Sequence, residues 1–347
     1  MKRKAVFVTD RPEETVRLVY LEDTIKKLTD ELDFPAGVLN IGSNNIEQYK
    51  DFTNECSYIF TTWGMLNLSE SDIEKYFKKC EVVFYGAGSV QYFAKEYLNR
   101  GIRVSSAWVA NGIPVAEYVV SQMLLSCKGY FKSVTSNRIK KRSDWGDASK
   151  VINTNYSGNY NTKIGILGIG TIGKRIITML KALNIKTEIL VYDPYFKDEQ
   201  AQSFGVRKSS LEEIFKTCDV VSNHIANLPS TEKMINKSHF NLMKDYATFI
   251  NTGRGQQIIE TDLTEVLKNN QTLTALIDVT DPEPPDEESE NCELYKLENV
   301  ILTPHIAGVI NKETGRLGDY MYEEYKLYES EKKLNYEVTL EMLKYMA

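Results

Sequence analysis

Short apolar runs alternate along this chain with longer segments of mixed polarity. Runs rich in β-branched and aromatic residues lie at 4–9, 58–62, 81–86, 101–106, 163–168, 188–193, 219–224, 246–251, 274–279 and 299–304. The segments between them have the length and polarity of helices. Strands that alternate with helices are typical of βαβ units, which build a parallel sheet covered on both faces. The pattern therefore predicts an α/β fold with two doubly wound parallel sheets in one chain.

Length and charge narrow the class of protein. A chain of 347 residues is longer than a domain with a single hydrophobic core usually is, so we expect two domains. Lys and Arg number 42 and Asp and Glu 48, which gives a net charge of −6 with no basic block. Such a chain is a poor candidate for binding nucleic acid or an anionic membrane. Because no apolar run approaches the roughly 18–20 residues that span a bilayer, we also expect no membrane segment.

Cysteine usage and the first residues suggest a cytoplasmic protein. The five cysteines are odd in number, widely spaced and without a CxxC pair, at positions 56, 80, 127, 218 and 292. This usage indicates a reducing compartment and no metal site. The start, MKRKAVFVTD, has only four apolar residues before polar ones return, which predicts a strand and not a signal peptide.

A glycine motif follows the apolar run at 163–168. GIGTIG, from Gly168 to Gly173, comes after this predicted strand and opens a helix with an apolar stripe. Gly168 would permit a tight turn, Gly170 the approach of a pyrophosphate, and Gly173 close packing of helix on strand. The N-terminus of that helix offers free N–H groups to phosphates. The motif predicts a dinucleotide site.

Asp193 ends the next predicted strand, 20 residues after Gly173. A carboxylate at this place binds the ribose hydroxyls of NAD and repels the additional phosphate of NADP. The alternative is a surface aspartate in a turn, and the spacing from the glycines favours the cofactor role. NAD is therefore the expected cofactor.

Three polar residues follow predicted strands further along the chain. Arg254 lies in NTGRG, Glu283 comes 29 residues later, and His305 follows after another 22 in LTPHIAG. All three fall at carboxyl ends of strands, the edge where open parallel sheets bind ligands. An arginine can grip a carboxylate with two hydrogen bonds. Taken singly, each has a plainer interpretation: a surface arginine, a solvated acidic loop at 281–290, and a structural histidine.

Together, GIGTIG with Asp193, NTGRG, IDVTDPEP and LTPHIAG resemble the D-isomer-specific 2-hydroxyacid dehydrogenases, in order and in spacing. YGAGSV at 85–90 is similar to the substrate loop of that family. The resemblance implies a Rossmann NAD-binding domain, 109–306, inserted into a flavodoxin-like substrate domain made of 1–108 and 307–347.

The resemblance also implies roles for individual residues. Arg254, Glu283 and His305 would be the catalytic trio that interconverts a small 2-oxo acid and a D-2-hydroxy acid: His305 would move the proton, Glu283 would orient it, and Arg254 would anchor the carboxylate. The main-chain amides of Gly88 and Ser89 would help to bind the substrate. Cofactor contacts are expected at Gly168, Gly170, Thr171, Ile172, Gly173, Asp193, His224, Thr252 and Asp278.

Two departures from the family leave the substrate open. GAGSV continues to Gln91 and Tyr92, without the usual acidic residue, and Ala226 replaces an expected proline in NHIANLPST. Around the substrate loop the chain supplies aromatics and only Lys95 as a cation. We therefore favour a non-phosphorylated 2-oxo acid.

Several alternatives remain open on the sequence. Asp278 is either a neighbour of the nicotinamide amide or a structural residue at a strand end. The apolar face at Val115–Cys127 is either buried within the monomer or a homodimer interface, and the family resemblance favours the homodimer. Four tyrosines between 320 and 328 predict a helix packed on the substrate domain, or one that shapes the substrate pocket. A dinucleotide-sensing corepressor is the rival function. A formate dehydrogenase is a poorer alternative, because an enzyme that transfers a hydride without a proton has no use for a His–Glu pair.

Overall fold

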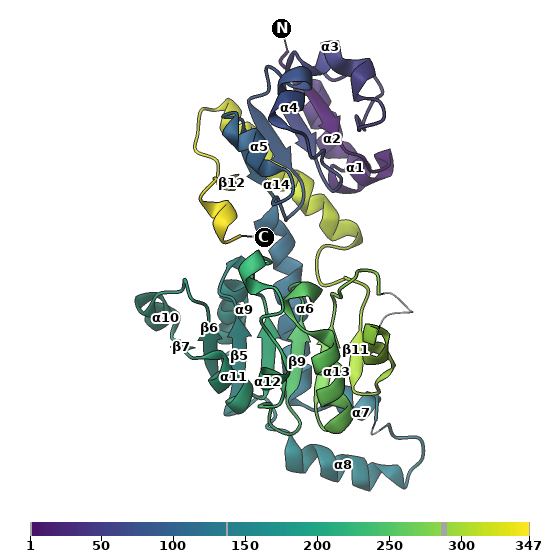
Figure 1. The fold of residues 1–347 in the computed structure, drawn as a ribbon, viewed down its shortest axis with the longest axis vertical. Coiled ribbons are helices and arrows are strands. Elements are labelled where there is room, and N and C mark those ends of the chain that lie inside the picture. The colour runs from purple at the N-terminus through teal and green to yellow at the C-terminus, as the bar shows by residue number, and fades with distance from the viewer. Residues whose placement is uncertain (1, 137, 286–289, 347) are drawn as a thin grey trace. The chain divides into compact units, whose positions relative to one another are not determined.

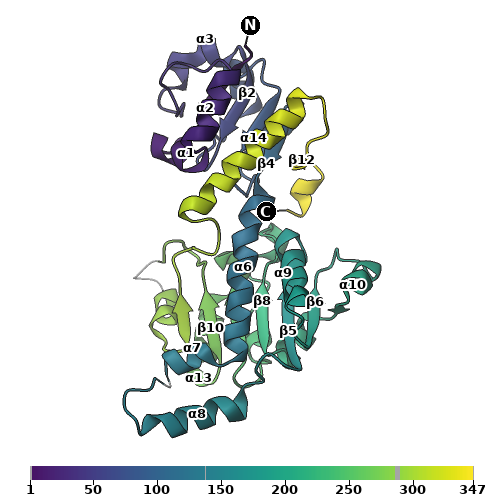
Figure 2. The ribbon, with the colours of Figure 1, turned by 180° about the vertical axis from the view of Figure 1, so that it is seen from behind.

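The computed structural model describes residues 2–136, 138–285 and 290–346. The chain forms two compact units, which Figures 1 and 2 show from opposite sides. The terminal unit comprises Met1–Gly112 and Val309–Ala347, and the central unit comprises Ile113–Gly308. These limits lie a few residues beyond the expected domain boundaries at 108/109 and 306/307. The two units are described separately below.

The terminal unit contains a five-stranded sheet in the order β1-β2-β3-β4-β12. The first four strands are parallel and the last is antiparallel to β4. On the outer side of β1, isolated parallel bridges join Lys4 to Asp33 and Val8 to Ile41. The strands are β1 (Lys4–Val8), β2 (Cys56–Thr61), β3 (Val82–Tyr85), β4 (Arg103–Ser106) and β12 (Glu337–Val338), and the helices are α1 (Glu13–Val19), α2 (Glu22–Glu31), α3 (Lys50–Thr53), α4 (Glu70–Tyr76), α5 (Ala94–Asn99) and α14 (Gly315–Glu329).

Helix α14 packs on this sheet and carries the C-terminal tyrosines. Tyr325 is buried, and its ring meets those of Tyr58, Phe60 and Phe84 edge-on. Tyr328 donates its hydroxyl to Glu81. The helix therefore packs on the terminal unit as expected from its pattern.

The central unit contains a seven-stranded sheet in the order β11-β10-β9-β8-β5-β6-β7, with every pair parallel. Its strands are β5 (Thr162–Leu167), β6 (Thr187–Tyr192), β7 (Arg207–Lys208), β8 (Val220–Asn223), β9 (Thr248–Asn251), β10 (Thr274–Ile277) and β11 (Val300–Leu302). Its helices are α6 (Trp108–Cys127, from Ile113 onward), α7 (Tyr130–Val134), α8 (Asp144–Asn155), α9 (Thr171–Ala182), α10 (Asp198–Phe204), α11 (Leu211–Thr217), α12 (Lys237–Phe240) and α13 (Glu260–Asn269).

Helices cover both faces of the central sheet. Helices α6 and α9 pack on one face, seen in Figure 2, and α11, α12 and α13 on the other, seen in Figure 1. The chain leaves β5 toward β6 on one side and later returns to place β8 on the other side. This reversal is a topological switch point, where open sheets of this kind bind ligands at the carboxyl ends of their strands.

The apolar face of α6 belongs to this core. Val115, Ala116, Val119 and Met123 are at most 6% exposed and pack with the residues of α9. Burial within the monomer therefore explains this face, and a homodimer built on it is not supported. Exposed apolar side chains lie instead on and between α7 and α8, at Tyr130, Val134, Ile139 and Trp145.

No helix in the described part of the chain is long and apolar enough to cross a membrane.

Candidate active site

The glycine motif forms the turn between β5 and α9. Gly168 has a φ of +86°, and a Cβ there would lie 2.4 Å from the carbonyl oxygen of His224. A Cβ at Gly173 would lie 2.4 Å from the oxygen of Gly168, whereas one at Gly170 would meet nothing within 4 Å. Gly168 and Gly173 are thus required by the protein's own backbone, whereas the space beside Gly170 is open. Helix α9 begins at Thr171 with no side-chain cap, so the N–H groups of its first turn are available to an anion.

Asp193 lies beside this turn at the end of β6. One carboxylate oxygen accepts a hydrogen bond from the N–H of Ile169 at 2.7 Å, and the other accepts one from the N–H of Tyr195 at 2.8 Å. The carboxylate is therefore held against the glycine motif. A bare helix N-terminus, an open position at Gly170 and an adjacent carboxylate together fit a dinucleotide.

His224 follows β8 on the other side of the glycine turn. Its ring nitrogens lie 2.8 Å from the hydroxyl of Ser222 and 3.3 Å from that of Thr252. Burial lowers the pKa of His224 to about 3, so the ring is neutral at physiological pH. The structure therefore places the neutral ring of His224 in hydrogen-bond contact with the hydroxyl of Thr252, beside the glycine turn.

Arg254 lies on the loop that follows β9. Its guanidinium donates to the carbonyl of Gly253 at 2.7 Å. Burial lowers the pKa of Arg254, and the nearby carboxylate of Glu283 opposes this effect. A Cβ at Gly255 would lie 2.1 Å from the carbonyl carbon of Thr280, so glycine lets the arginine loop pack against the loop that carries Glu283.

Glu283 and His305 form a direct pair. The Oε1 atom of Glu283 lies 2.5 Å from Nδ1 of His305, and both side chains are partly exposed, at 38% and 45%. The second ring nitrogen, Nε2, thus faces away from this bond and is the one that can exchange a proton with a ligand. The pair comes from the loops after β10 and β11, next to the loop of Arg254. The last part of the acidic run, 286–289, lies outside the described residues.

Asp278 stabilises the turn that contains His305. His305 adopts a φ of +53°, a left-handed conformation that a non-glycine residue seldom takes. The buried carboxylate of Asp278 accepts hydrogen bonds from the hydroxyl of Thr303 at 2.6 Å and from the N–H groups of Ile306 and Ala307 at 2.9 Å each. Asp278 therefore has a structural role in holding the strained turn. Its expected contact with the cofactor stays a prediction.

Sequence reasoning missed two buried side chains that support these loops. Gln257 is fully buried behind the arginine loop, and Glu260, at 3% exposure, accepts a hydrogen bond from the N–H of Asp281 at 3.0 Å. Burial raises the pKa of Glu260 to about 6. The apolar spacing of Leu263, Val266 and Leu267 could have shown that the face at Glu260 is turned inward.

In the terminal unit, Gly88 and Ser89 follow β3. The hydroxyl of Ser106 donates to the carbonyls of Ala87 and Gly88 at 2.9 Å each. Within the described residues, no hydrogen bond involves the N–H of Gly88 or of Ser89. These two main-chain donors are thus available to a ligand, as a carboxylate contact requires.

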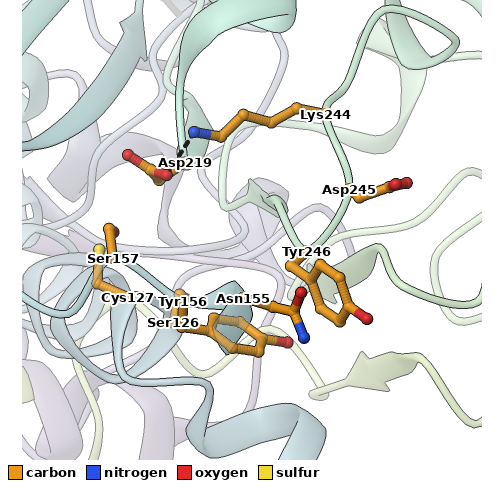
Figure 3. Close-up of a pocket in the computed structure, with 9 residues that line it drawn as sticks. All are labelled: Ser126, Cys127, Asn155, Tyr156, Ser157, Asp219, Lys244, Asp245 and Tyr246. Carbon is orange, nitrogen blue, oxygen red and sulfur yellow. Dashed lines mark ion pairs between the residues drawn. The ribbon is translucent and has the colours of Figure 1, made fainter. Parts of the chain in front are cut away.

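A separate pocket lies at the amino ends of β5, β8 and β9 and is distinct from these loops. It has a volume of about 170 Å³ and a polar lining that includes Ser126, Tyr156 and the ion pair of Asp219 with Lys244 (Figure 3). None of the predicted site residues lines it, so it is not the candidate active site.

Comparison with known proteins identifies the family. Residues 122–307, more than half of the chain, match the family described as D-isomer specific 2-hydroxyacid dehydrogenase, NAD binding domain. The chain belongs to this family. The match covers the glycine turn, Asp193 and the three loops described above, so the central unit contains an NAD-binding domain.

Individual relatives agree with this assignment. The chain is 30% identical over 287 residues to D-3-phosphoglycerate dehydrogenase of Methanocaldococcus jannaschii, an alignment covering 82% of this chain and 51% of that protein. Two solved structures share the fold over 97% of this chain: D-mandelate dehydrogenase of Rhodotorula graminis (TM-score 0.76, 19% identity, 98% of that chain) and an NAD-complexed D-isomer specific 2-hydroxyacid dehydrogenase of Lactobacillus delbrueckii (TM-score 0.73, 20% identity, 100% of that chain). The chain spans less than two thirds of the length of the curated relatives it matches.

Proposed function

We propose that this chain is an NAD-dependent oxidoreductase that interconverts a small 2-oxo acid and the corresponding D-2-hydroxy acid. The observation that carries the proposal is the 2.5 Å contact between Glu283 and His305 beside the loop of Arg254. A histidine oriented by a carboxylate and placed near a half-buried guanidinium suits the transfer of a proton to a substrate that carries a negative charge.

Each of the three side chains has a defined part in this reaction. When bound, NADH supplies the hydride that reduces the carbonyl carbon. Arg254 binds the substrate carboxylate and polarises the carbonyl, while His305 donates the proton from Nε2 to the carbonyl oxygen. Glu283 holds Nδ1, which fixes the tautomer and the orientation of the ring. In the oxidation of a hydroxy acid, His305 removes the proton instead.

The glycine motif would hold the cofactor through its main chain, and Asp193 through its side chain. The N–H groups at Gly170, Thr171 and Ile172 bind the pyrophosphate, and Gly173 lets the helix approach. Asp193 binds the ribose hydroxyls and disfavours the 2′-phosphate of NADPH by charge repulsion, so we expect NADH to be preferred. His224 and Thr252 line the site from the neighbouring loops.

The proposed substrate is non-phosphorylated. In the terminal unit, the N–H groups of Gly88 and Ser89 are the proposed substrate-binding donors. Tyr85 ends β3 and Tyr92 lies in the segment after it, and Lys95 is the one cation in the sequence from Tyr85 to Tyr97.

We further propose a homodimer in the cytoplasm. Since the face of α6 is buried, the proposed dimer surface is the exposed apolar group of Tyr130, Val134, Ile139 and Trp145. Light scattering at micromolar concentration tests it, and a monomeric mass would reject it.

The oxidation of NADH at 340 nm with a panel of unbranched, branched, aromatic and phosphorylated 2-oxo acids tests the function, and NADPH is run in parallel. We expect turnover with at least one non-phosphorylated acid and a clear preference for NADH. Binding of NADH without turnover on any acid would favour the corepressor alternative, and equal rates with NADPH would reject the role of Asp193.

A further inference from the structure

Three buried amide side chains lie behind the loop of Arg254. Asn223 and Asn251 end the adjacent strands β8 and β9 and pair with each other in the sheet register. Gln257 follows the arginine loop, and all three are 0% exposed. We call Asn223, Asn251 and Gln257 the amide cluster.

The cluster holds the main chain of Arg254 from both sides. The Oε1 atom of Gln257 accepts hydrogen bonds from the N–H of Arg254 at 3.1 Å and from the amide of Asn223 at 2.7 Å. The Nδ2 atom of Asn251 donates to the carbonyl of Arg254 at 3.3 Å, and its Oδ1 accepts from the amide of Asn223 at 3.0 Å. Both polar groups of the Arg254 backbone therefore have partners in the cluster.

The same cluster reaches the loop beside the cofactor turn. The amide nitrogen of Gln257 donates to the carbonyl of Ile225 at 2.5 Å, and Asn223 accepts from the N–H of Ile225 at 3.2 Å. Gly253 is required for this arrangement, since a Cβ there would lie 2.5 Å from Oε1 of Gln257. One carboxamide thus connects the arginine loop to the loop that starts at His224.

We infer that Gln257 is a positioning residue that fixes the distance between Arg254 and the cofactor loop, and so sets the placement of the substrate carboxylate. The inference rests on the proposed function. Loss of the carboxamide would leave the N–H of Arg254 and the carbonyl of Ile225 without these hydrogen bonds, which favours a shift of the loop toward water. A misplacement of about 1 Å can lower a rate about 100-fold.

Gln257→Met tests the inference, because methionine has a similar length and lacks the hydrogen bonds. We expect kcat/KM for the 2-oxo acid to fall about 10- to 100-fold per folded site, with the Kd for NADH changed by no more than about twofold. Gln256→Met is the matched control, since Gln256 is the exposed neighbour and its side chain accepts a hydrogen bond from Asn227 at 3.1 Å. It should behave like the unsubstituted protein. An unchanged kcat/KM in Gln257→Met, or parallel losses of NADH binding and turnover, would overturn the inference.

Gln257→Glu provides a second route if the methionine variant fails to fold. A protonated glutamic acid reproduces the hydrogen bonds of glutamine, with its hydroxyl donating to Ile225, whereas a carboxylate repels that carbonyl. Two ionisable residues belong to the loops that Gln257 contacts: Arg254, through its N–H, and His224, which precedes Ile225. We expect the rate of Gln257→Glu, divided by that of the unsubstituted protein at each pH, to rise as pH falls from 8 to 5.5, and a flat ratio would count against the inference.

Failure of the proposed function is distinguishable from failure of this inference. If the unsubstituted protein turns over none of the 2-oxo acids, the proposed function is wrong. The amide cluster is then judged by calorimetry of oxamate, a non-reacting carboxylate analogue, binding to the NADH complex. Weaker binding in Gln257→Met with NADH affinity retained would support the positioning role, and equal binding would reject it.

Discussion

Two parts of one sheet edge in the central unit achieve binding in opposite ways. The loops after β9, β10 and β11 present ionisable side chains, Arg254, Glu283 and His305, each supported by a buried polar partner. The turn between β5 and α9 presents almost no side chain, since it depends on glycines and on the N–H groups of the helix start. The first part is suited to moving a proton, and the second to binding charge that does not react.

This difference predicts which substitutions affect turnover and which affect affinity. In the side-chain part, a changed residue removes a reacting group and leaves the cofactor site intact. In the glycine part, an added methyl group fills space that the cofactor or the backbone needs. Strain also differs: His305 carries a left-handed conformation without being glycine, whereas Gly168 adopts φ +86° without a Cβ.

His305→Ala should have the largest effect. Loss of a positioned acid or base lowers kcat by about 10²–10⁴-fold, while the Kd for NADH should stay nearly unchanged because the histidine is not assigned to the nucleotide. Single-turnover rates and NADH fluorescence titration check the two halves of this statement. A variant that is less stable but turns over normally per folded site would show that His305 is structural.

Gly170→Ala should come next, with the opposite signature. A Cβ at Gly170 meets no protein atom within 4 Å, so the melting temperature should not change, but the methyl group occupies the approach of the pyrophosphate. We expect the Kd for NADH to rise about tenfold or more, a loss of about 1.4 kcal/mol or more. Gly168→Ala is the contrast: its Cβ clashes with His224, so it should lower the melting temperature as well. Tight NADH binding by Gly170→Ala would remove the basis of the comparison.

Glu283→Gln should have a smaller effect. The amide keeps a hydrogen-bond acceptor for Nδ1 but loses the negative charge that strengthens this 2.5 Å contact, so the ring of His305 is held less firmly for proton transfer. We expect kcat for reduction of the 2-oxo acid to fall about tenfold, with the Kd for NADH nearly unchanged. Single-turnover rates per NADH-competent site measure this, and an unchanged kcat would reject the pairing of Glu283 with His305.

Much of this edge is predictable from the sequence because strand position determines it. All ten apolar runs become strands, and the motif residues at their carboxyl ends come to one edge because the sheet is parallel. The two-residue strands β7 and β12 were not predicted. β7 is exposed and has no apolar pattern, and β12 depends on a partner more than 200 residues away.

The buried residues that hold the loops of the site were harder to predict from the sequence. Gln257 is a polar residue in a loop sequence, and its burial follows from the pairing of Asn223 with Asn251, which requires the sheet register. Asp278 had two interpretations on the sequence, and only the fold shows that the N–H groups of 306 and 307 turn back to its carboxylate. The face of α6 was ambiguous for a similar reason, because an apolar face does not specify what covers it.

Glu260 offers the smallest and most specific test of these supports. Its pKa is raised to about 6 by burial, so the folded state favours the neutral acid. Stability from this group is therefore full below the ordinary pKa of a glutamic acid and is lost as pH rises through about 6. Glu260→Gln imitates the neutral form and keeps an acceptor for Asp281, and the hydroxyl of Tyr295, which lies 2.8 Å from the carboxylate, can turn to accept from the new amide. We expect the free energy of unfolding to rise by at most about 2 kcal/mol at pH 8, which is a few degrees in melting temperature, and this gain should shrink at pH 5.

Glu265→Gln, on the exposed side of the same helix, is the control. It removes only a surface ion pair with Lys237 and should change stability by less than about 1 kcal/mol at either pH. A Glu260→Gln variant that is less stable than the unsubstituted protein at pH 8 would show that the charge of this carboxylate is itself needed to hold the loop of Glu283.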